Sequence, residues 1–236
     1  MEKYDKNSNQ SYALGTTLTF ELLKRKGDKA TRIYISPKQK RDETYSKLVA
    51  LAKSLRLPVI ENNEKIFKAL SDKDNCMVIG EFKKWEEDIP AGNHVVLVNP
   101  SNLGNLGTIL RSCAAFQIDG LAIIRPAADV FDPKCIRSSM GAVFSLPFKY
   151  YLSFEDYLKD FPSQSLYPFM LQTDTYLGEE KKKSPYSLIF GNEATGLPIE
   201  FKKVGIPVKI PQSSTVDSLN LDNAVSIGLY EYRKVK

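Results

Sequence analysis

The chain has 236 residues, enough for one large domain or two modest ones with a buried core. Its 33 Lys and Arg residues against 28 Asp and Glu give a net charge of 33 − 28 = +5, a mild basic excess that permits nucleic-acid binding without proving it. The single histidine excludes most ordinary hydrolase and metalloenzyme mechanisms, and His94 is more simply explained as a residue at the start of a strand.

The cysteines, the lengths of the apolar runs and the N-terminal residues indicate in which cellular compartment the protein is expected. Cys76, Cys113 and Cys135 form no CxxC pair, which argues against a disulfide framework or a zinc site and favours a reducing compartment. No window approaches the ~18–20 unbroken apolar residues of a membrane span. Met1 to Gln10 is polar and charged, as in a disordered lead rather than a signal peptide. We therefore expect a cytoplasmic protein without a metal or a membrane contact.

Helices and strands alternate over roughly the first eighty residues. Leucines at helical spacing predict a helix over Tyr12–Lys26, which ends on cations followed by Gly27. The alternation predicts a small α/β unit. Its other expected elements are strands at Arg32–Ile35, Pro58–Ile60 and Cys76–Gly80 and helices at Tyr45–Leu55 and Asn63–Leu70.

A charged stretch with a proline and a glycine, Phe82–Gly92, is the best linker candidate. It divides the chain into a domain of residues 1–88 and a domain of residues 89–236. Beyond it the alternation resumes and predicts a parallel α/β fold with helices on both faces of the sheet. The expected strands are His94–Val98, Leu121–Ile124, Val143–Leu146, Tyr167–Gln172, Ser187–Phe190 and Val208–Ile210. The expected helices are Asn105–Phe116, Pro133–Ser139, Phe154–Phe161 and Leu219–Lys234.

Three polar loops of the second domain are candidates for a site. The first, Asn99–Arg111, follows a strand and opens a helix, where α/β proteins place ligands, but it lacks the dinucleotide-binding glycine spacing. Asn105 and Arg111 lie nearly two helical turns apart and could face the same cleft. An Asn cap and a surface arginine explain them equally well.

The second stretch is Leu188–Pro198, and the third is Lys209–Tyr230. Gly191 would allow a ligand to approach the backbone closely, and Glu193 is either a helix cap or a ligand contact. At the start of the last helix, Ser218 could be a plain cap and Asn220 a residue of the first turn. Each loop alone is a weak signal, whereas their order and combination are specific.

Together these residues resemble a known family. Asn105-x-Gly107 followed by Arg111, Gly191-Asn192-Glu193-x-x-Gly196-Leu197, and Ile210-Pro211 followed by Ser218-Leu219-Asn220 are similar to the three motifs of the SpoU (TrmH) RNA 2′-O-ribose methyltransferases, of the SPOUT class. The segment Ser138–Phe144 resembles an element that the family has between its first two motifs. The likeness covers about Val95 to Arg233, and residues 12–80 are similar in pattern to the family's small RNA-binding domain.

The resemblance implies a C-terminal parallel-sheet domain with a trefoil knot, a small N-terminal α/β RNA-binding domain, and S-adenosyl-methionine as cofactor. The implied cofactor-binding residues are Phe190, Gly191, Asn192, Glu193, Ile210, Pro211, Ser218, Leu219, Asn220, Ala224 and Gly141. The implied catalytic residues are Arg111, Asn105, Ser218, Asn220 and Glu193. Of these, Arg111 is expected to position phosphate and ribose and to polarise the hydroxyl, because an arginine is a poor base.

The same resemblance implies a homodimer with the last helix at its interface, through Ala224, Ile227, Gly228 and Tyr230, and an RNA substrate. Cations of the N-terminal domain are candidates for RNA docking. The substrate, rRNA or tRNA, stays open. So do two other functions: a catalytically silent RNA-binding or ribosome-assembly factor, and a methyltransferase that acts on a base.

Overall fold

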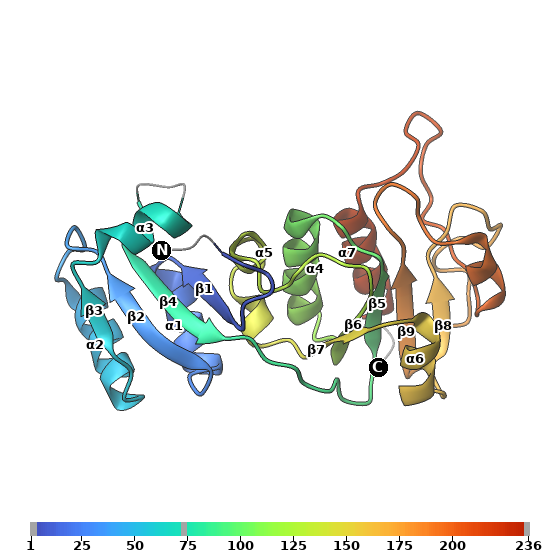
Figure 1. Cartoon of the computed structure of the whole chain (residues 1–236). Helices are drawn as coiled ribbons and strands as arrows, with labels where there is room; N and C mark the ends of the chain where they lie inside the picture. Colours follow the sequence, from blue (N-terminus) through green and yellow to red (C-terminus); the bar gives the residue numbers. More distant parts are fainter. Residues whose placement is uncertain (1–3, 72–74, 234–236) are drawn as a thin grey trace. The chain divides into compact units, whose positions relative to one another are not determined.

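A computed structural model describes residues 4–71 and 75–233, and the chain divides into two compact units (Figure 1). One unit comprises Met1–Trp85 together with Asp129–Ser145, and the other comprises Glu86–Ala128 with Leu146–Lys236. The expected linker therefore begins too early, since Phe82 and Lys83 belong to a strand. The segment Asp129–Ser145, expected in the second domain, groups with the first.

The N-terminal unit holds a four-stranded mixed sheet in the order β1-β4-β2-β3. Only β2 and β3 pair in parallel, and β4 is antiparallel to both of its neighbours. The strands are β1 (Gln10–Leu14), β2 (Ala30–Ile35), β3 (Val59–Glu61) and β4 (Val78–Lys83). The helices are α1 (Thr16–Arg25), α2 (Glu43–Ser54), α3 (Glu64–Leu70) and α5 (Pro133–Ser138).

The start of the chain differs from the expectation. Gln10–Leu14 is a strand paired with β4, and Gly15, at φ +111°, separates it from the helix, which begins at Thr16 rather than near Tyr12. Pairing with a distant strand overrides the helical spacing of the leucines. The prediction that residues 1–10 are disordered is wrong from Tyr4 onward, since the Tyr4 hydroxyl donates to the Asp129 carboxylate at 2.5 Å. Residues 1–3 lie outside the described residues.

The C-terminal unit holds a five-stranded sheet in the order β7-β6-β5-β9-β8, and every pairing is parallel, as expected. Along the chain, β5, β6 and β7 extend the sheet in one direction, and β8 and β9 lie on the other side of β5. The strand order therefore reverses between β5 and β9, which is where α/β sheets leave a crevice at their carboxyl ends. The strands are β5 (His94–Val98), β6 (Gly120–Ile124), β7 (Phe148–Tyr151), β8 (Ser165–Pro168) and β9 (Tyr186–Phe190).

Two expected strands of this half of the chain are wrong. Val143–Leu146 is occupied by a short 3₁₀ helix, Ala142–Phe144, which follows the left-handed Gly141, and the strand comes later, at β7. Val208–Ile210 makes only isolated bridges, from Val208 to Phe169 and from Lys209 to Tyr176.

Helices cover both faces of this sheet. On one face, α6 (Phe154–Asp160) and the short helix Ile199–Lys203 bury Phe154, Tyr157 and Phe201 in a core with alternate residues of the strands. On the other face, α4 (Leu103–Ala115) and α7 (Leu221–Tyr232) lie side by side (Figure 1), joined by a 2.9 Å hydrogen bond between Ser112 and Ser226. Lys234, expected to end the last helix, lies outside the described residues.

His94 is a buried structural residue, as expected. Its Nε2 lies 2.8 Å from the Pro90 carbonyl oxygen and its Nδ1 2.9 Å from the Tyr157 hydroxyl. A carbonyl can only accept, so Nε2 carries the proton and Tyr157 donates to Nδ1. Within residues 4–71 and 75–233, no helix is long and apolar enough to cross a membrane, and no cluster of acidic, His or Cys side chains is placed to hold a metal ion.

Candidate functional site

A cavity of ≈ 330 Å³ opens beyond the carboxyl ends of β8 and β9, beside the point where the strand order reverses. Three segments supply most of its wall, namely residues 169–172, 190–197 and 208–219. Leu221 and Ala224 of α7 complete it. All of these residues belong to the C-terminal unit.

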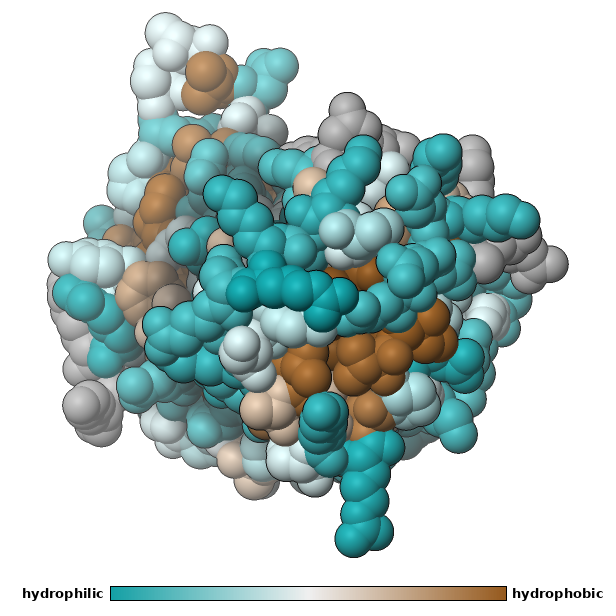
Figure 2. All heavy atoms as spheres, turned by 90° about the vertical axis from the view of Figure 1, so that its left-hand side faces the viewer, coloured by the Kyte–Doolittle hydropathy of each residue, from teal (hydrophilic) through white to brown (hydrophobic). Residues whose placement is uncertain are grey.

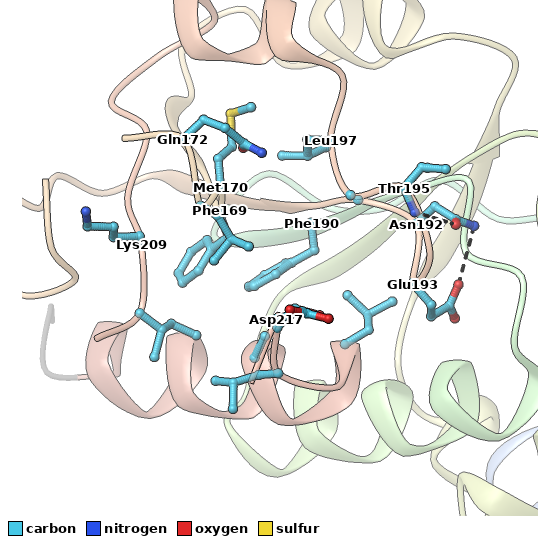
Figure 3. A pocket seen from close by; sticks show the side chains of 18 of the residues that line it. Phe169, Met170, Gln172, Phe190, Asn192, Glu193, Thr195, Leu197, Lys209 and Asp217 are labelled. Carbon is cyan, nitrogen blue, oxygen red and sulfur yellow. Dashed lines mark hydrogen bonds between the residues drawn. The ribbon is translucent and has the colours of Figure 1, made fainter. Parts of the chain in front are cut away.

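Two stacked aromatic rings form one wall of the cavity. The ring centroids of Phe169 and Phe190 lie 4.3 Å apart. Figure 3 shows the two rings next to each other. Gly228 of α7 lies against both rings, and a Cβ there would come within 2.8 Å of Phe169 Cζ and 3.2 Å of Phe190 Cζ. The glycine lets the helix approach the aromatic pair closely.

The loop after β9 folds back on itself. The backbone groups of Asn192 and Gly196 bond to each other in both directions, at 2.9 and 3.2 Å. A Cβ on Gly191 would lie 2.1 Å from the carbonyl carbon of Gly196, so only glycine fits there. The close approach expected at Gly191 is therefore an approach of the loop's own backbone. Gly196 has a left-handed φ of +68°, which glycine adopts without strain.

Glu193 is held by the first loop and does not point freely into solvent. Its carboxylate accepts hydrogen bonds from Ser101 N at 3.1 Å, Ser101 Oγ at 2.9 Å and Asn102 N at 3.1 Å, at the start of α4. Burial alone would raise the pKa of Glu193, but these bonds to the ionised form outweigh it and hold the pKa below its usual 4.5. A carboxylate that is ionised and already satisfied is a positioning group and a poor proton acceptor.

One side-chain amide connects the three polar loops. Asn105 Nδ2 donates to Asn220 Oδ1 at 3.2 Å and to Glu193 Oε1 at 3.4 Å. Asn220 Oδ1 also accepts from the N–H of Leu221 at 2.9 Å and so caps α7. Asn220, expected in the first turn of the last helix, is thus its cap and also a link between loops.

The segment after the second loop is hydrogen-bonded on two sides. Met170 N donates to Val208 O at 2.9 Å and Val208 N to Pro168 O at 2.8 Å. On the other side, Lys209 N donates to Thr175 O at 3.0 Å, and the Lys209 carbonyl oxygen accepts from Leu177 N at 2.8 Å. Residues 208–209 therefore lie between the two arms of the loop 168–177.

The charged groups of the cavity are few. Lys209 places its ammonium 4.4 Å from the centroid of the Tyr176 ring. Asp217 lines the cavity and, among the described residues, forms no ion pair. The carboxylate of Glu193 is already hydrogen-bonded to the start of α4. Asp217 (Figure 3) is therefore the acidic side chain of the cavity that remains available to a ligand.

The structure brings most of the expected cofactor residues together. The following ones line the cavity: Phe190, Gly191, Asn192, Glu193, Ile210, Ser218, Leu219 and Ala224. Pro211 and Asn220 are neighbours of lining residues and do not line it themselves. Gly141 does not line it either, because it belongs to the N-terminal unit, where a Cβ would lie 2.9 Å from Glu21 Cβ.

Arg111 does not join the cavity. Asn105 faces Glu193 and Asn220, whereas six residues turn an α-helix by about 600°, which leaves Arg111 on another side of α4. Arg111 is exposed and makes no hydrogen bond or ion pair within the described part of the chain. The expectation that both side chains face one cleft does not hold within a single copy of the chain.

Sequence reasoning missed the wall made by residues 169–172. It assigned them to a strand, whereas β8 ends at Pro168 and the chain turns into the cavity. The available signal was their place after a strand next to β9, because carboxyl ends of neighbouring parallel strands share one edge. Thr195, Gln212 and Asp217 also line the cavity and were not expected there.

A flat apolar wall, main-chain polar groups of irregular loops and a volume of ≈ 330 Å³ suit a small organic ligand. Fold and site together define a parallel α/β protein with a ligand cavity at its topological switch point. The chain belongs to the SpoU rRNA methylase family, whose model matches residues 92–230. A second model, RNA 2'-O ribose methyltransferase substrate binding, matches residues 12–85.

Relatives and solved structures agree with this membership. The 23S rRNA (uridine(2479)-2'-O)-methyltransferase of Streptomyces viridochromogenes is 33% identical over 145 residues, 58% of this chain and 50% of that protein. RlmP of Bacillus subtilis, a 23S rRNA (guanosine(2553)-2'-O)-methyltransferase, is 29% identical over 176 residues, 72% of this chain and 71% of that protein. The match spans about half the length of the Streptomyces relative.

Among solved structures, the AdoMet-bound rRNA methyltransferase of Sinorhizobium meliloti superposes with a TM-score of 0.81 at 26% identity, covering 97% of this chain and 88% of that one. The expected family and the α/β fold with its parallel sheet are thereby confirmed.

Proposed function

We propose that the protein transfers a methyl group from S-adenosyl-methionine to a ribose 2′-hydroxyl of RNA. The observation that carries this proposal is the cavity of the matched domain, closed by the Asn105 link between the three polar loops. The two relatives named above are 2'-O-methyltransferases of 23S rRNA. Their activity supports an enzyme and does not support the catalytically silent alternative.

The residues of the cavity fit the cofactor. Phe190, Leu197 and Leu219 offer apolar surface for an adenine ring, and the irregular backbone around Ile210 offers polar groups to its edge. Asp217 offers a carboxylate to a cationic ligand. When bound, S-adenosyl-methionine supplies an electrophilic methyl group next to a positive sulfur.

The ribose hydroxyl is a poor acid, so the protein must help to make its oxygen nucleophilic. Arg111 is exposed and uncommitted, and a guanidinium stays protonated at neutral pH, so it acts as a positioning and polarising cation rather than as a base. It holds the RNA phosphate and ribose in place, and proximity supplies much of the rate. Asn105, Ser218, Asn220 and Glu193 shape the surroundings.

Because Arg111 lies outside the cavity of its own chain, the site is completed in a homodimer. The last helix supports such a contact through Ile227, 39% exposed, and Tyr230, 50% exposed. Ala224 lines the cavity and Gly228 is buried against Phe169, so both face the interior of their own chain. The dimer contact is therefore left to Ile227 and Tyr230. A concentration-dependent molecular mass in solution tests the dimer.

RNA is the substrate. The presence of the N-terminal unit favours rRNA over tRNA, because the rRNA methyltransferase of Sinorhizobium meliloti covers 97% of this chain and a structure for the 2-OH methylation of C/U34 on tRNA covers 60%. The N-terminal unit supports RNA docking through cations that face solvent, such as Lys38 and Lys40. Arg25, Arg32 and Arg41 are less available, because each pairs with a glutamate. Figure 2 shows a mainly hydrophilic face with hydrophobic atoms gathered near its centre and at its upper left, a mixture suited to phosphates and bases. Such a protein works in the cytoplasm.

The C-terminal segment is also inferred to thread a loop, as a knotted domain requires. Support comes from residues 208–209, which are bonded to both arms of the loop 168–177 before the chain continues to α7. An experimental electron-density trace of residues 166–221 tests this inference. A segment that passes around the loop, rather than through it, would overturn it.

Two measurements test the function. Calorimetric titration should show one molecule of S-adenosyl-methionine bound per chain. Mapping of ribose methylation in total RNA should show that one 2′-O-methyl group is lost when the gene is absent. Absence of cofactor binding would favour the RNA-binding alternative, and a methyl group on a base would favour the base-modifying one.

Arg111→Ala tests the role of the arginine. It should lower turnover by about 10²-fold or more while cofactor affinity stays unchanged. Lys202→Ala, on the short helix Ile199–Lys203, also removes one exposed positive charge and serves as the control, because Lys202 does not line the cavity. Near-normal turnover of Arg111→Ala with intact RNA binding contradicts this role.

A further inference from the structure

A second arginine stands out on the C-terminal unit. Arg125, directly after β6, is exposed, and its guanidinium carbon lies 4.5 Å from the centroid of the Tyr150 ring. No carboxylate of the described residues forms an ion pair with it. Stacking on an aromatic face orients a guanidinium while leaving its N–H edge free to bind an anion.

Both members of this pair are fixed by the fold. The Tyr150 hydroxyl donates to the Ala128 carbonyl oxygen at 2.8 Å, and the Arg125 N–H donates to the Tyr151 carbonyl oxygen at 2.9 Å. The position of the cation is therefore set by β6, β7 and the turn between residues 125 and 128. A cation held in this way loses little conformational entropy when it binds.

The pair lies on the same edge of the sheet as the cofactor cavity. The turn 125–128 is bonded to the turn after β5, through Ala128 N to Pro100 O at 2.8 Å and Asn99 N to Ile124 O at 3.1 Å. That second turn leads into Ser101, which binds Glu193 of the cavity loop. In the order β7-β6-β5-β9-β8, the cavity occupies one half of the edge and Arg125 with Tyr150 the other.

We propose that Arg125 and Tyr150 form a docking site for the RNA strand that delivers its ribose to the cavity. The free guanidinium edge binds a backbone phosphate. Leu152, at the end of β7, is 80% exposed and supplies apolar surface for a neighbouring base or ribose. The proposal rests on the proposed function and adds to it the residues that hold the substrate beside the cofactor.

Binding of a mixed-sequence single-stranded RNA oligonucleotide, measured over a salt series, tests this site without any turnover. Arg125→Ala should weaken binding about tenfold at low salt, the effect of one charge-assisted hydrogen bond. It should also lower the slope of log K against log salt by about 0.7, the value for one phosphate contact on a single strand. Arg125→Lys should keep the slope and bind less tightly, because lysine keeps the charge and lacks the stacked plane.

Lys202→Ala is the control variant. Lys202 is exposed on the short helix Ile199–Lys203, forms no ion pair among the described residues and does not line the cavity. RNA affinity of Arg125→Ala equal to that of the wild type, or an equal loss in Lys202→Ala, overturns the proposal. An equal loss of poly-glutamate binding by Arg125→Ala also overturns it, since the site would then select acidic chains in general.

The outcome is separable from that of the proposed function. S-adenosyl-methionine affinity should be the same in Arg125→Ala and wild type, because Arg125 does not line the cavity. A wild-type protein that binds RNA through Arg125 but transfers no methyl group would refute the function and leave the docking site standing.

Discussion

Asn105 and Asn220, 115 positions apart in the chain, are joined by a 3.2 Å hydrogen bond between their side-chain amides. The same nitrogen of Asn105 reaches Glu193 at 3.4 Å, so one side chain connects the starts of α4 and α7 with the loop after β9. The shape of the cavity mouth therefore depends on an amide that does not itself line the cavity.

Replacing Asn105 should loosen the cavity without deleting any of its walls. In Asn105→Ala, two acceptors lose a donor, and we expect a destabilisation of about 1–2 kcal/mol and weaker binding of S-adenosyl-methionine. Thermal unfolding and calorimetric titration measure the two effects. Asn223→Ala, an exposed amide on α7, is the control. Unchanged cofactor affinity in Asn105→Ala would show that the link is not needed for the site.

Glu193 should make stability depend on pH in the acid range. Its folded pKa lies below the usual 4.5, because hydrogen bonds to the carboxylate outweigh the effect of burial. Its stabilising contribution is therefore present above about pH 4.5 and is lost as the pH falls through the lower folded value. The difference in unfolding free energy between wild type and Glu193→Gln should be large at pH 7 and shrink towards pH 3. A difference that does not vary with pH contradicts the ionised state.

His94 should add a second, separate pH effect. Burial is the main cause of a folded pKa below the usual 6.5, so the folded protein keeps the ring neutral while the unfolded chain takes up a proton. Stability should therefore fall as the pH drops below about 6.5, and this part of the fall should be absent in His94→Gln. Denaturant unfolding between pH 7.5 and 5.5 measures it. As the single histidine of the sequence, His94 also gives one NMR titration curve, whose midpoint should lie below 6.5.

The two glycines of the loop after β9 should respond differently to alanine. A Cβ on Gly191 would lie 2.1 Å from Gly196, so Gly191→Ala should open the loop, lower stability by about 1–3 kcal/mol and abolish cofactor binding. Gly196→Ala meets no atom within 4 Å and carries only the cost of its left-handed φ, about 1–2 kcal/mol, with cofactor binding retained. Normal cofactor affinity in Gly191→Ala is the result that would falsify this account of the loop.

Sequence reasoning was most successful where local pattern dominates. Apolar runs such as His94–Val98 predicted the central strands of the parallel sheet, because buried parallel strands are apolar throughout. The polar loops were also recognisable, since Gly191-Asn192-Glu193 directly after such a run is more polar than a turn requires. Their order along the chain was sufficient to indicate the family.

What the tertiary structure decided depends on contacts between distant residues. Phe169 became a wall of the cavity because the chain turns after Pro168 and its bridge with Val208 fixes the turn, which no local spacing predicts. Gly141 moved to the N-terminal unit because residues 129–145 pack there. Arg111 lies outside the cavity, because the orientation of α4 is set by its buried face and by Asn105 and not by the arginine. Sequence alone thus determined which segments carry chemistry, and long-range packing decided which of their side chains meet.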